Sequence, residues 1–238
     1  MGRDDVGGLE TRLAAVRRDI AEAARRADRD PAAVRIVAVT KTFPPAAVLA
    51  ALAVGLADVG ENYVQEAAAK RAAALGGTWH LIGGLQRNKA AAAVATFDCI
   101  HTVDRPEIAE ALGRQAGHAG KRLAVLVQVN VAGDAAKRGV APEGAETACA
   151  AVLGQTALAL DGLMTIGLAG DDPEAARPHF RTLRELRDRL ARRLGVELPH
   201  LSMGMSGDFA VAVEEGATLV RLGRVLFGAR QPRAWREE

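Results

Sequence analysis

The chain has 238 residues, a formal net charge of +2 at pH 7 and 49% hydrophobic residues, with only two Trp, one Tyr and five Phe. So small a net charge excludes a strong electrostatic bias toward nucleic acid or membrane surfaces. No run of about 18 apolar residues could span a bilayer, residues 1–35 lack the apolar core of a signal peptide, and Cys99 and Cys149 have neither metal nor disulfide spacing. We therefore expect a cytoplasmic protein.

The predicted secondary structure alternates between strand and helix. Apolar residues at helical spacing first predict an amphipathic helix over residues 7–28, which ends before Asp30 and Pro31. Short apolar strands are then predicted at residues 34–40, 57–61, 78–83, 99–103, 123–131, 160–166, 200–205 and 218–222. Segments of helical composition separate or follow them, at residues 45–55, 62–75, 87–96, 106–119, 142–157, 173–194 and 208–216.

This alternation predicts the fold class. Short apolar strands without polar alternation are typical of parallel strands covered on both faces. Strict strand-to-helix alternation over about this length favours an α/β fold, a single (β/α)8 TIM barrel with an extra N-terminal helix, over an open doubly wound sheet. No linker or low-complexity tract divides the chain, so we expect residues 1–238 to form a single domain. In either fold, active sites collect in the loops that follow the strands.

Lys41 ends the first predicted strand, in the stretch VAVTKTFPP. A cation there is costly to bury unless it is paired, neutralised or used in chemistry. One interpretation is a rim lysine paired with a carboxylate such as Glu61. The other is a lysine that forms a Schiff base, because a desolvated or cation-flanked amine loses its proton more readily. Lys89 and Lys137 also follow strands, so position alone does not decide between them.

The loops after the last two strands predict a phosphate site. Barrels commonly bind phosphate there, because free backbone N–H groups at a helix N-terminus attract anions. Ser206 adds a hydroxyl, and Gly207 and Gly223 let the backbone come close. The alternative is that Ser206 or Asp208 caps a helix and that the glycines serve turns. A lysine and a phosphate cradle together suit an aldehyde that bears a phosphate, of which pyridoxal 5′-phosphate is the common example.

Longer motifs resemble one family. They are AVTKTFP, GENYVQEAAAK, WHLIGGLQRNK, HTVDR, QVN followed by KRG, GLMTIG, LSMGMSGDF and VRLGRVLFGAR. In this order they closely resemble the YggS/PROSC family of pyridoxal phosphate homeostasis proteins over nearly the whole chain. The resemblance implies a barrel like the N-terminal domain of alanine racemase, with pyridoxal 5′-phosphate carried on a lysine.

The resemblance also implies the cofactor contacts. The lysine is Lys41, and the partner of the pyridine nitrogen is Arg221. The remaining contacts are one residue near the cofactor ring and a phosphate cradle, and they fall on Asn62, Ser206, Gly207, Gly223 and the backbone of Arg224. Many relatives carry Thr or Ser at the last of these positions, so we expect the backbone of Arg224 to matter more than its guanidinium.

Arg221 bears on whether the protein is an enzyme. A permanently cationic partner disfavours a protonated pyridine nitrogen, which weakens the cofactor as an electron sink. A salt bridge from Arg221 to Asp208 or Glu61 is the alternative role. Two-sided proton transfer also needs a second base opposite the lysine. In alanine racemase that base is a tyrosine from a separate C-terminal domain, which we expect to be absent here, where Tyr63 is the one tyrosine.

The expected function is therefore that of a non-catalytic carrier. We expect it to hold pyridoxal 5′-phosphate on Lys41, to buffer it and to deliver it to PLP-dependent apoenzymes, which supports vitamin B6 and amino-acid homeostasis as the resemblance implies. We expect a monomer without nucleic-acid or membrane partners. The alternatives are a weak amino-acid racemase and a phosphosugar enzyme that uses a carboxylate base such as Glu61.

Three further features of the sequence carry predictions. The five histidines show no close metal-binding pair, so we expect no metal site, and His80 is interpreted as a hydrogen-bonded core residue. The arginine-rich segment 181–195 has a buried apolar stripe, which indicates a solvated helix face rather than nucleic-acid binding. The cluster at residues 86–89 serves capping and solubility, or docks a client enzyme or a second cofactor molecule.

Overall fold

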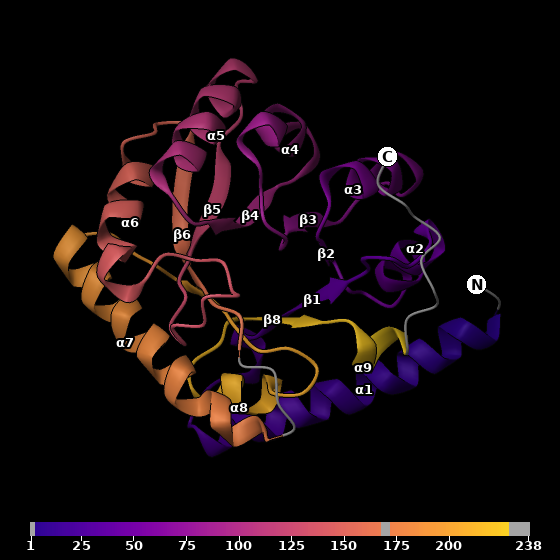
Figure 1. The fold of residues 1–238 in the computed structure, drawn as a ribbon. Coiled ribbons are helices and arrows are strands. Elements are labelled where there is room, and N and C mark those ends of the chain that lie inside the picture. The colour runs from indigo at the N-terminus through magenta and orange to yellow at the C-terminus, as the bar shows by residue number, and fades with distance from the viewer. Residues whose placement is uncertain (1–2, 168–171, 229–238) are drawn as a thin grey trace.

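The computed structural model describes residues 3–167 and 172–228, with side chains from residue 8 onward (Figure 1). Eight parallel strands pair in chain order and close into a barrel, in which β1 also pairs with β8. The strands are β1 Arg35–Val39, β2 Asp58–Glu61, β3 Thr78–Leu81, β4 Cys99–Val103, β5 Leu123–Gln128, β6 Leu158–Met164, β7 His200–Ser202 and β8 Leu219–Leu222. The predicted barrel is confirmed, and the open doubly wound sheet is excluded.

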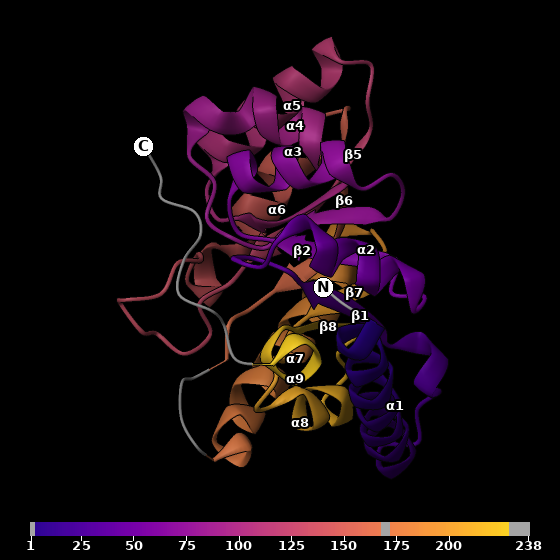
Figure 2. The ribbon, with the colours of Figure 1, turned by 90° about the vertical axis from the view of Figure 1, so that its right-hand side faces the viewer.

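Helices surround the barrel, as Figures 1 and 2 show. Their bounds are α1 Arg3–Arg26, α2 Pro45–Ala53, α3 Val64–Ala73, α4 Ala90–Thr96, α5 Pro106–His118, α6 Ala145–Leu153, α7 Arg177–Leu194, α8 Phe209–Glu214 and α9 Arg224–Phe227. The extra helix α1 packs along α8 and α9, on the side where the barrel closes. No helix in the described ranges is both long and apolar enough to cross a membrane.

The predicted elements differ from the observed ones mainly at their ends. β7 stops at Ser202 rather than at residue 205, because the chain turns toward α8 there. β5 stops at Gln128, and Val129 forms only an isolated bridge with Val140. The predicted helix over 142–157 ends at Leu153, where Gly154 forms the C-cap. The short helix α9 was not predicted.

Helix α7 has the amphipathic pattern that its sequence predicts. Phe180, Leu183 and Leu186 are buried, and arginines occupy the outer face. One of these arginines, Arg181, pairs with the buried carboxylate of Glu215 at 2.9 Å. The arginine-rich segment is thus a solvated face that is partly neutralised by α8 and the residue after it, as expected.

The barrel has two apolar layers. The larger one lies between the strands and the helices. The smaller one fills the barrel interior and contains Val37, Cys99, Leu126, Met164 and Leu219. Alternation along a strand could not say which face of β1 is internal, because both faces are buried. The structure resolves this point, since Val37 belongs to the interior cluster and Val39 lines the pocket above it.

Candidate functional site

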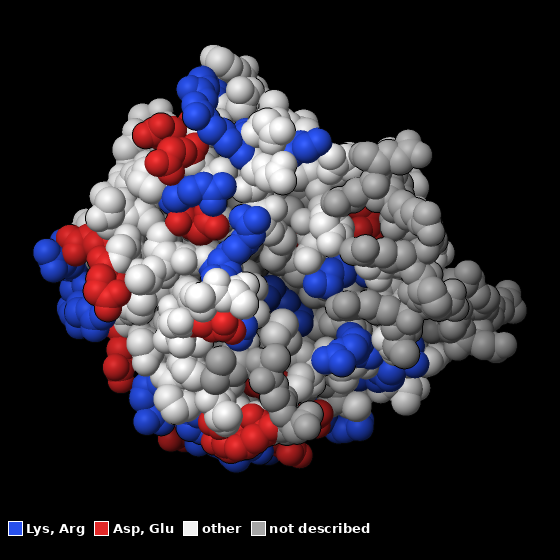
Figure 3. Space-filling view, viewed as in Figure 1, with Lys and Arg blue, Asp and Glu red and all other residues white. Residues whose placement is uncertain are grey.

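A pocket of about 490 Å³ opens where the strands end at their carboxyl side. Figure 3 shows basic side chains around a hollow near the middle of this face. All the residues predicted for the cofactor site line this one pocket, namely Lys41, Asn62, Ser206, Gly207, Arg221, Gly223 and Arg224. These residues come from the ends of β1, β2, β7 and β8, so the barrel topology brings together positions that are far apart in the chain.

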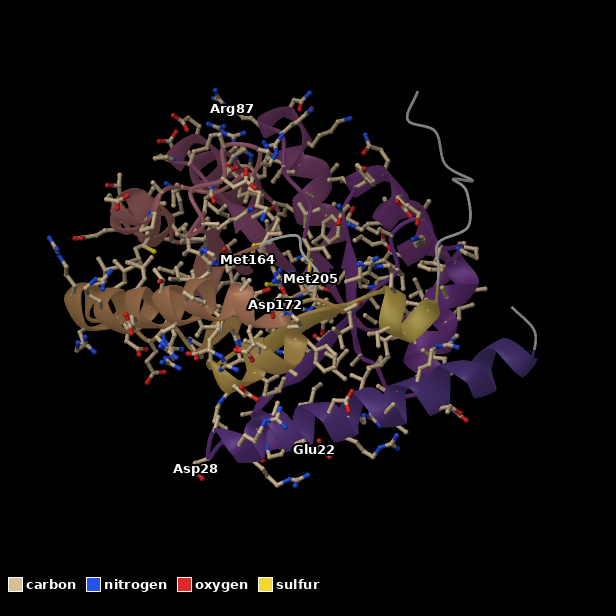
Figure 4. The ribbon with its side chains drawn as sticks, turned by 60° about the horizontal axis from the view of Figure 1, so that its bottom comes forward. Glu22, Asp28, Arg87, Met164, Asp172 and Met205 are labelled. Carbon is tan, nitrogen blue, oxygen red and sulfur yellow. The ribbon has the colours of Figure 1, made fainter. Side chains whose placement is uncertain are left out.

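Other residues that line the pocket are apolar or acidic. Figure 4 shows Met164, Met205 and Asp172 close together at the pocket, with Arg87 well away from them. Arg87 and Asn88, from the cluster at residues 86–89, line a separate open depression between α4 and α5. The structure therefore does not bring this cluster to the predicted cofactor site.

The turn that carries Lys41 has an unusual backbone. Thr42, the next residue, has a φ of 68°, a left-handed conformation that is uncommon for a residue with a branched β-carbon. Its N–H donates a hydrogen bond of 2.6 Å to Glu66 Oε1. The half-buried Lys41 is thus held on a strained turn that a buried carboxylate of α3 fixes in place.

A buried ion cluster supports this turn from behind. Lys70 Nζ donates to Thr40 O at 2.6 Å, to Glu61 Oε1 at 2.7 Å and to Glu66 Oε1 at 2.7 Å. All three charged side chains are at most 4% exposed. Sequence reasoning missed Lys70 and Glu66, although both lie within GENYVQEAAAK at the i, i+4 spacing of a helical ion pair.

Glu61 is therefore an ion-pair partner of Lys70. Burial raises the pKa of the Glu61 carboxyl and outweighs the opposing effects of Lys70 and of the Thr40 hydroxyl. Its Oε2 is buried and has no hydrogen-bond partner among the described residues. Glu61 is fully buried and does not line the pocket, which argues against its use as the catalytic base of a phosphosugar enzyme.

The two glycine-containing loops meet across the pocket. Ser206 Oγ accepts a hydrogen bond of 3.3 Å from the N–H of Val225, which joins the loop after β7 to the start of α9. Asp208 Oδ1 accepts one of 2.6 Å from the N–H of Met205. Asp208 precedes α8 but makes no side-chain hydrogen bond to the helix amides, so the alternative in which Asp208 caps this helix is not supported. Ser206, in contrast, binds an amide at the first turn of α9.

These loops leave several backbone donors available. Within the described residues, the amides of Ser206, Gly207 and Gly223 donate to no other group. A Cβ built on Gly207 would meet no atom within 4 Å, so the space beside its α-carbon is open. Unused N–H groups beside open space form a cradle for an anion. Arg224, which is exposed, adds positive charge at the edge of the cradle.

Arg221 forms the buried base of the pocket. It is 4% exposed, and its guanidinium donates to Ser202 Oγ at 2.7 Å and to Thr165 O at 2.8 Å. Among the described residues, its hydrogen-bond partners are thus neutral oxygens, and not the carboxylates of Asp208 or Glu61 that the alternative role required. Burial lowers the pKa of Arg221 to about 10, so the side chain remains cationic at neutral pH.

Asn62 lies where β2 leaves the barrel. A Cβ on Gly83, at the end of β3, would stand 2.2 Å from the backbone oxygen of Asn62. Only glycine lets the two strand ends come this close, which keeps Asn62 at the pocket wall. The signal for this contact is the Gly pair in LIGGL, whose role was not recognised from the sequence.

The site therefore combines three kinds of groups. Lys41 offers an amine, Arg221 offers donors to a buried acceptor, and the two glycine loops offer amides to an anion. An aromatic ring with an aldehyde and a phosphate would match each group in turn.

Comparison with known proteins agrees with this arrangement. A family model described as "Alanine racemase, N-terminal domain" matches residues 11–231. The pyridoxal phosphate homeostasis protein of Pseudomonas aeruginosa is 46% identical over 220 residues, which are 92% of this chain and 94% of that protein. The protein of the same name from Aquifex aeolicus is 42% identical over 222 residues, which are 92% of this chain and 97% of that protein.

Solved structures show the same architecture. PipY from Synechococcus elongatus, solved with PLP bound, has a TM-score of 0.82 at 37% identity, covering 92% of this chain and 100% of that one. An alanine racemase from Clostridium difficile has a TM-score of 0.74 at 14% identity over 94% of this chain and 57% of that one, which shows a likeness of fold alone. The chain belongs to the family of pyridoxal phosphate homeostasis proteins, within the wider alanine racemase N-terminal domain family.

Proposed function

We propose that the chain binds pyridoxal 5′-phosphate as a Schiff base on Lys41 and that it holds and releases the cofactor. The observation that carries this proposal is the convergence of all the predicted contact residues on one pocket of about 490 Å³. The relatives are named for pyridoxal phosphate homeostasis, and the PipY structure contains PLP. Both findings support the same cofactor for this chain.

Each part of the pocket has a distinct task in this proposal. The bound cofactor supplies an aldehyde that condenses with an amine. Lys41 provides the amine, on a turn fixed by Glu66. Arg221 donates a hydrogen bond to the ring nitrogen and keeps it unprotonated by charge repulsion. The amides of Ser206 and Gly207, together with the loop after β8, hold the phosphate.

The same residues argue for a carrier rather than an enzyme. Among the described residues that line the pocket, none is a tyrosine, histidine or cysteine that could act as a second base opposite Lys41. The lining aspartates, Asp172 and Asp208, both accept hydrogen bonds from backbone amides. Arg221 weakens the bound ring as an electron sink. A reversible Schiff base would keep a reactive aldehyde from modifying other amines until an acceptor displaces it.

We extend the proposal to the setting of this function. The chain acts as a monomer, with residues 1–238 as a single domain, and it delivers the cofactor to PLP-dependent apoenzymes. Cys99 and Cys149 are both buried free thiols, which supports a reducing compartment such as the cytoplasm.

Reductive trapping tests the proposed linkage. After incubation with pyridoxal 5′-phosphate and reduction with borohydride, we expect peptide mapping to find the label on Lys41. Lys41→Ala is expected to lose both the label and the absorbance band of the Schiff base. Lys89→Ala, which also follows a strand but does not line the pocket, is the matched control and should keep both. Trapping on another lysine in the unmodified protein would overturn the proposal.

Isotope exchange tests the alternative racemase activity. We expect alanine incubated in deuterium oxide with the cofactor-loaded protein to exchange its α-hydrogen no faster than with Lys41→Ala. The reason is the missing second base and the weakened electron sink. Exchange that depends on Lys41, measured by mass spectrometry, would instead establish a racemase.

A further inference from the structure

A chain of hydrogen-bonded side chains crosses the inside of the barrel, starting at the pocket. Arg221 donates to Ser202 Oγ at 2.7 Å, and Ser202 Oγ lies 2.9 Å from His101 Nδ1. His101 Nε2 lies 2.9 Å from His80 Nδ1, and His80 Nε2 lies 2.8 Å from Asp58 Oδ1. Arg221 lies on β8, Ser202 on β7, His101 on β4, His80 on β3 and Asp58 on β2. The series of hydrogen bonds therefore links strands on different sides of the barrel.

With both histidine rings neutral, the two ends of this series fix the position of every proton between them. An arginine can only donate hydrogen bonds, and an ionised carboxylate can only accept them. Ser202 must therefore accept from Arg221 and donate to His101 Nδ1. His101 must then donate from Nε2 to His80 Nδ1, and His80 must donate from Nε2 to Asp58. Both histidines are neutral Nε2–H tautomers in this arrangement.

Burial and charge agree with this assignment. Ser202 and His101 are 0% exposed, and His80 is 2% exposed. Burial, and then the nearby His80 and Arg221, hold the pKa of His101 well below its usual value. Burial alone would raise the pKa of Asp58, but hydrogen bonds from His80 and Arg35 lower it overall. The carboxylate end of the series is thus charged, and His101 is neutral.

A metal site is the competing explanation of the same cluster. Ligand atoms of His80, Cys99 and His101 all lie within 4.8 Å of one another. However, all four ring nitrogens of the two histidines already have hydrogen-bond partners within the barrel. Burial also raises the pKa of the Cys99 thiol, which opposes the thiolate that a metal would need. The cluster is therefore better explained as a hydrogen-bonded chain.

We propose that Ser202, His101, His80 and Asp58 form a relay that positions Arg221. A carboxylate hydrogen-bonded to Arg221 would take several of its N–H groups. Asp208, whose charge favours the cationic form of Arg221, instead accepts a hydrogen bond from the N–H of Met205. The serine hydroxyl takes one N–H, so the guanidinium stays cationic and keeps donors for a ligand in the pocket. This inference deepens the proposed function and rests on it, because the ligand is the ring nitrogen of the bound cofactor.

Nuclear magnetic resonance of the unmodified protein tests the relay without any cofactor. In protein labelled with ¹⁵N-histidine, we expect His80 and His101 to show two neutral Nε2–H rings across the range of pH in which the protein is folded. A charged ring or an Nδ1–H tautomer at either position would overturn the proton assignment. One equivalent of zinc in the purified protein, bound through these rings, would overturn it as well.

Variants test whether the relay acts on the pocket. His101→Leu removes both the acceptor for Ser202 and the donor to His80, whereas His101→Gln keeps an amide acceptor and donor. We expect His101→Leu to raise the dissociation constant of pyridoxal 5′-phosphate about tenfold, the usual effect of losing one hydrogen bond to a charged group. It should also shift the absorbance maximum of the bound cofactor, and His101→Gln should restore much of both. His200→Gln, which changes a half-buried histidine outside the relay, is the matched control.

These measurements separate failure of the inference from failure of the proposed function. If the unmodified protein traps no cofactor on Lys41, the proposed function fails, and the tautomers still report on the relay. If it does trap cofactor but His101→Leu changes neither the dissociation constant nor the spectrum, the relay does not position Arg221. A loss in His101→Leu that His101→Gln does not restore would point to packing and would also count against the inference.

Discussion

Lys70→Met is expected to lower the free energy of unfolding by about 3–5 kcal/mol, the usual cost of removing one partner from a buried ion pair. Lys70 is 2% exposed, and its Nζ is the cation between the carboxylates of Glu61 and Glu66. Without it, two buried carboxylates face each other, and one must take up a proton. Denaturant unfolding followed by circular dichroism at pH 7 measures the loss.

The pH dependence of Lys70→Met gives a second measure of the same effect. Burial already raises the pKa of Glu61, and losing Lys70 removes the largest opposing influence. The folded variant then binds more protons than the unfolded chain above the ordinary carboxyl pKa. Its stability should therefore be highest at acidic pH and fall as the pH rises through the raised pKa of the folded state.

Two further variants show whether the charge of Lys70 is the cause. Lys89→Met changes a lysine for which the structure shows no ion pair within the described residues, and we expect a change of at most about 0.5 kcal/mol. Adding Glu66→Gln to Lys70→Met removes one of the two carboxylates and should restore part of the stability. A loss below about 1 kcal/mol in Lys70→Met would contradict the role of the cluster.

The fold could be predicted from the sequence because most strands are short apolar runs that end at a turn signal. All the strands and their parallel order around the barrel follow from this rhythm. The predicted ends of the helices and strands were less accurate. Residues 203–205 are as apolar as a strand, but the backbone turns there so that Asp208 can bind the N–H of Met205. The four-residue helix α9 was too short to give a periodic signal.

The site was predictable only in part, for a physical reason. Motifs identified the residues that line the pocket, but not the residues behind them. The salt bridge of Arg221 to a carboxylate was the alternative role, yet Arg221 binds Ser202 and the backbone oxygen of Thr165, because only the closed barrel brings these groups to one point. Likewise, Glu66 and Lys70 have the i, i+4 spacing of an ordinary helix ion pair. Only the structure shows that the turn after β1 lies against this pair.

Gly207→Val is expected to raise the dissociation constant of pyridoxal 5′-phosphate about 100-fold while leaving the stability of the protein within about 0.5 kcal/mol. The backbone of Gly207 is not in the left-handed region, and an added Cβ meets no protein atom within 4 Å. The new side chain would therefore cost the free protein little. In the complex, it would occupy the space through which the phosphate reaches the free amides, and the loss of one or two hydrogen bonds to a charged group gives the stated factor.

Fluorescence titration of Gly207→Val with the cofactor, alongside thermal unfolding without it, checks both halves of this prediction. Gly117→Val is the matched control, since Gly117 is also exposed and its added Cβ would lie 3.9 Å from the side chain of Ala157, far from the pocket. An unchanged dissociation constant would mean that the phosphate is not held by this loop. A large loss of stability would mean that the glycine is required by the fold itself. Weak cofactor binding by a Gly207→Val protein of unchanged stability would show that Gly207 is needed for the ligand and not for the turn.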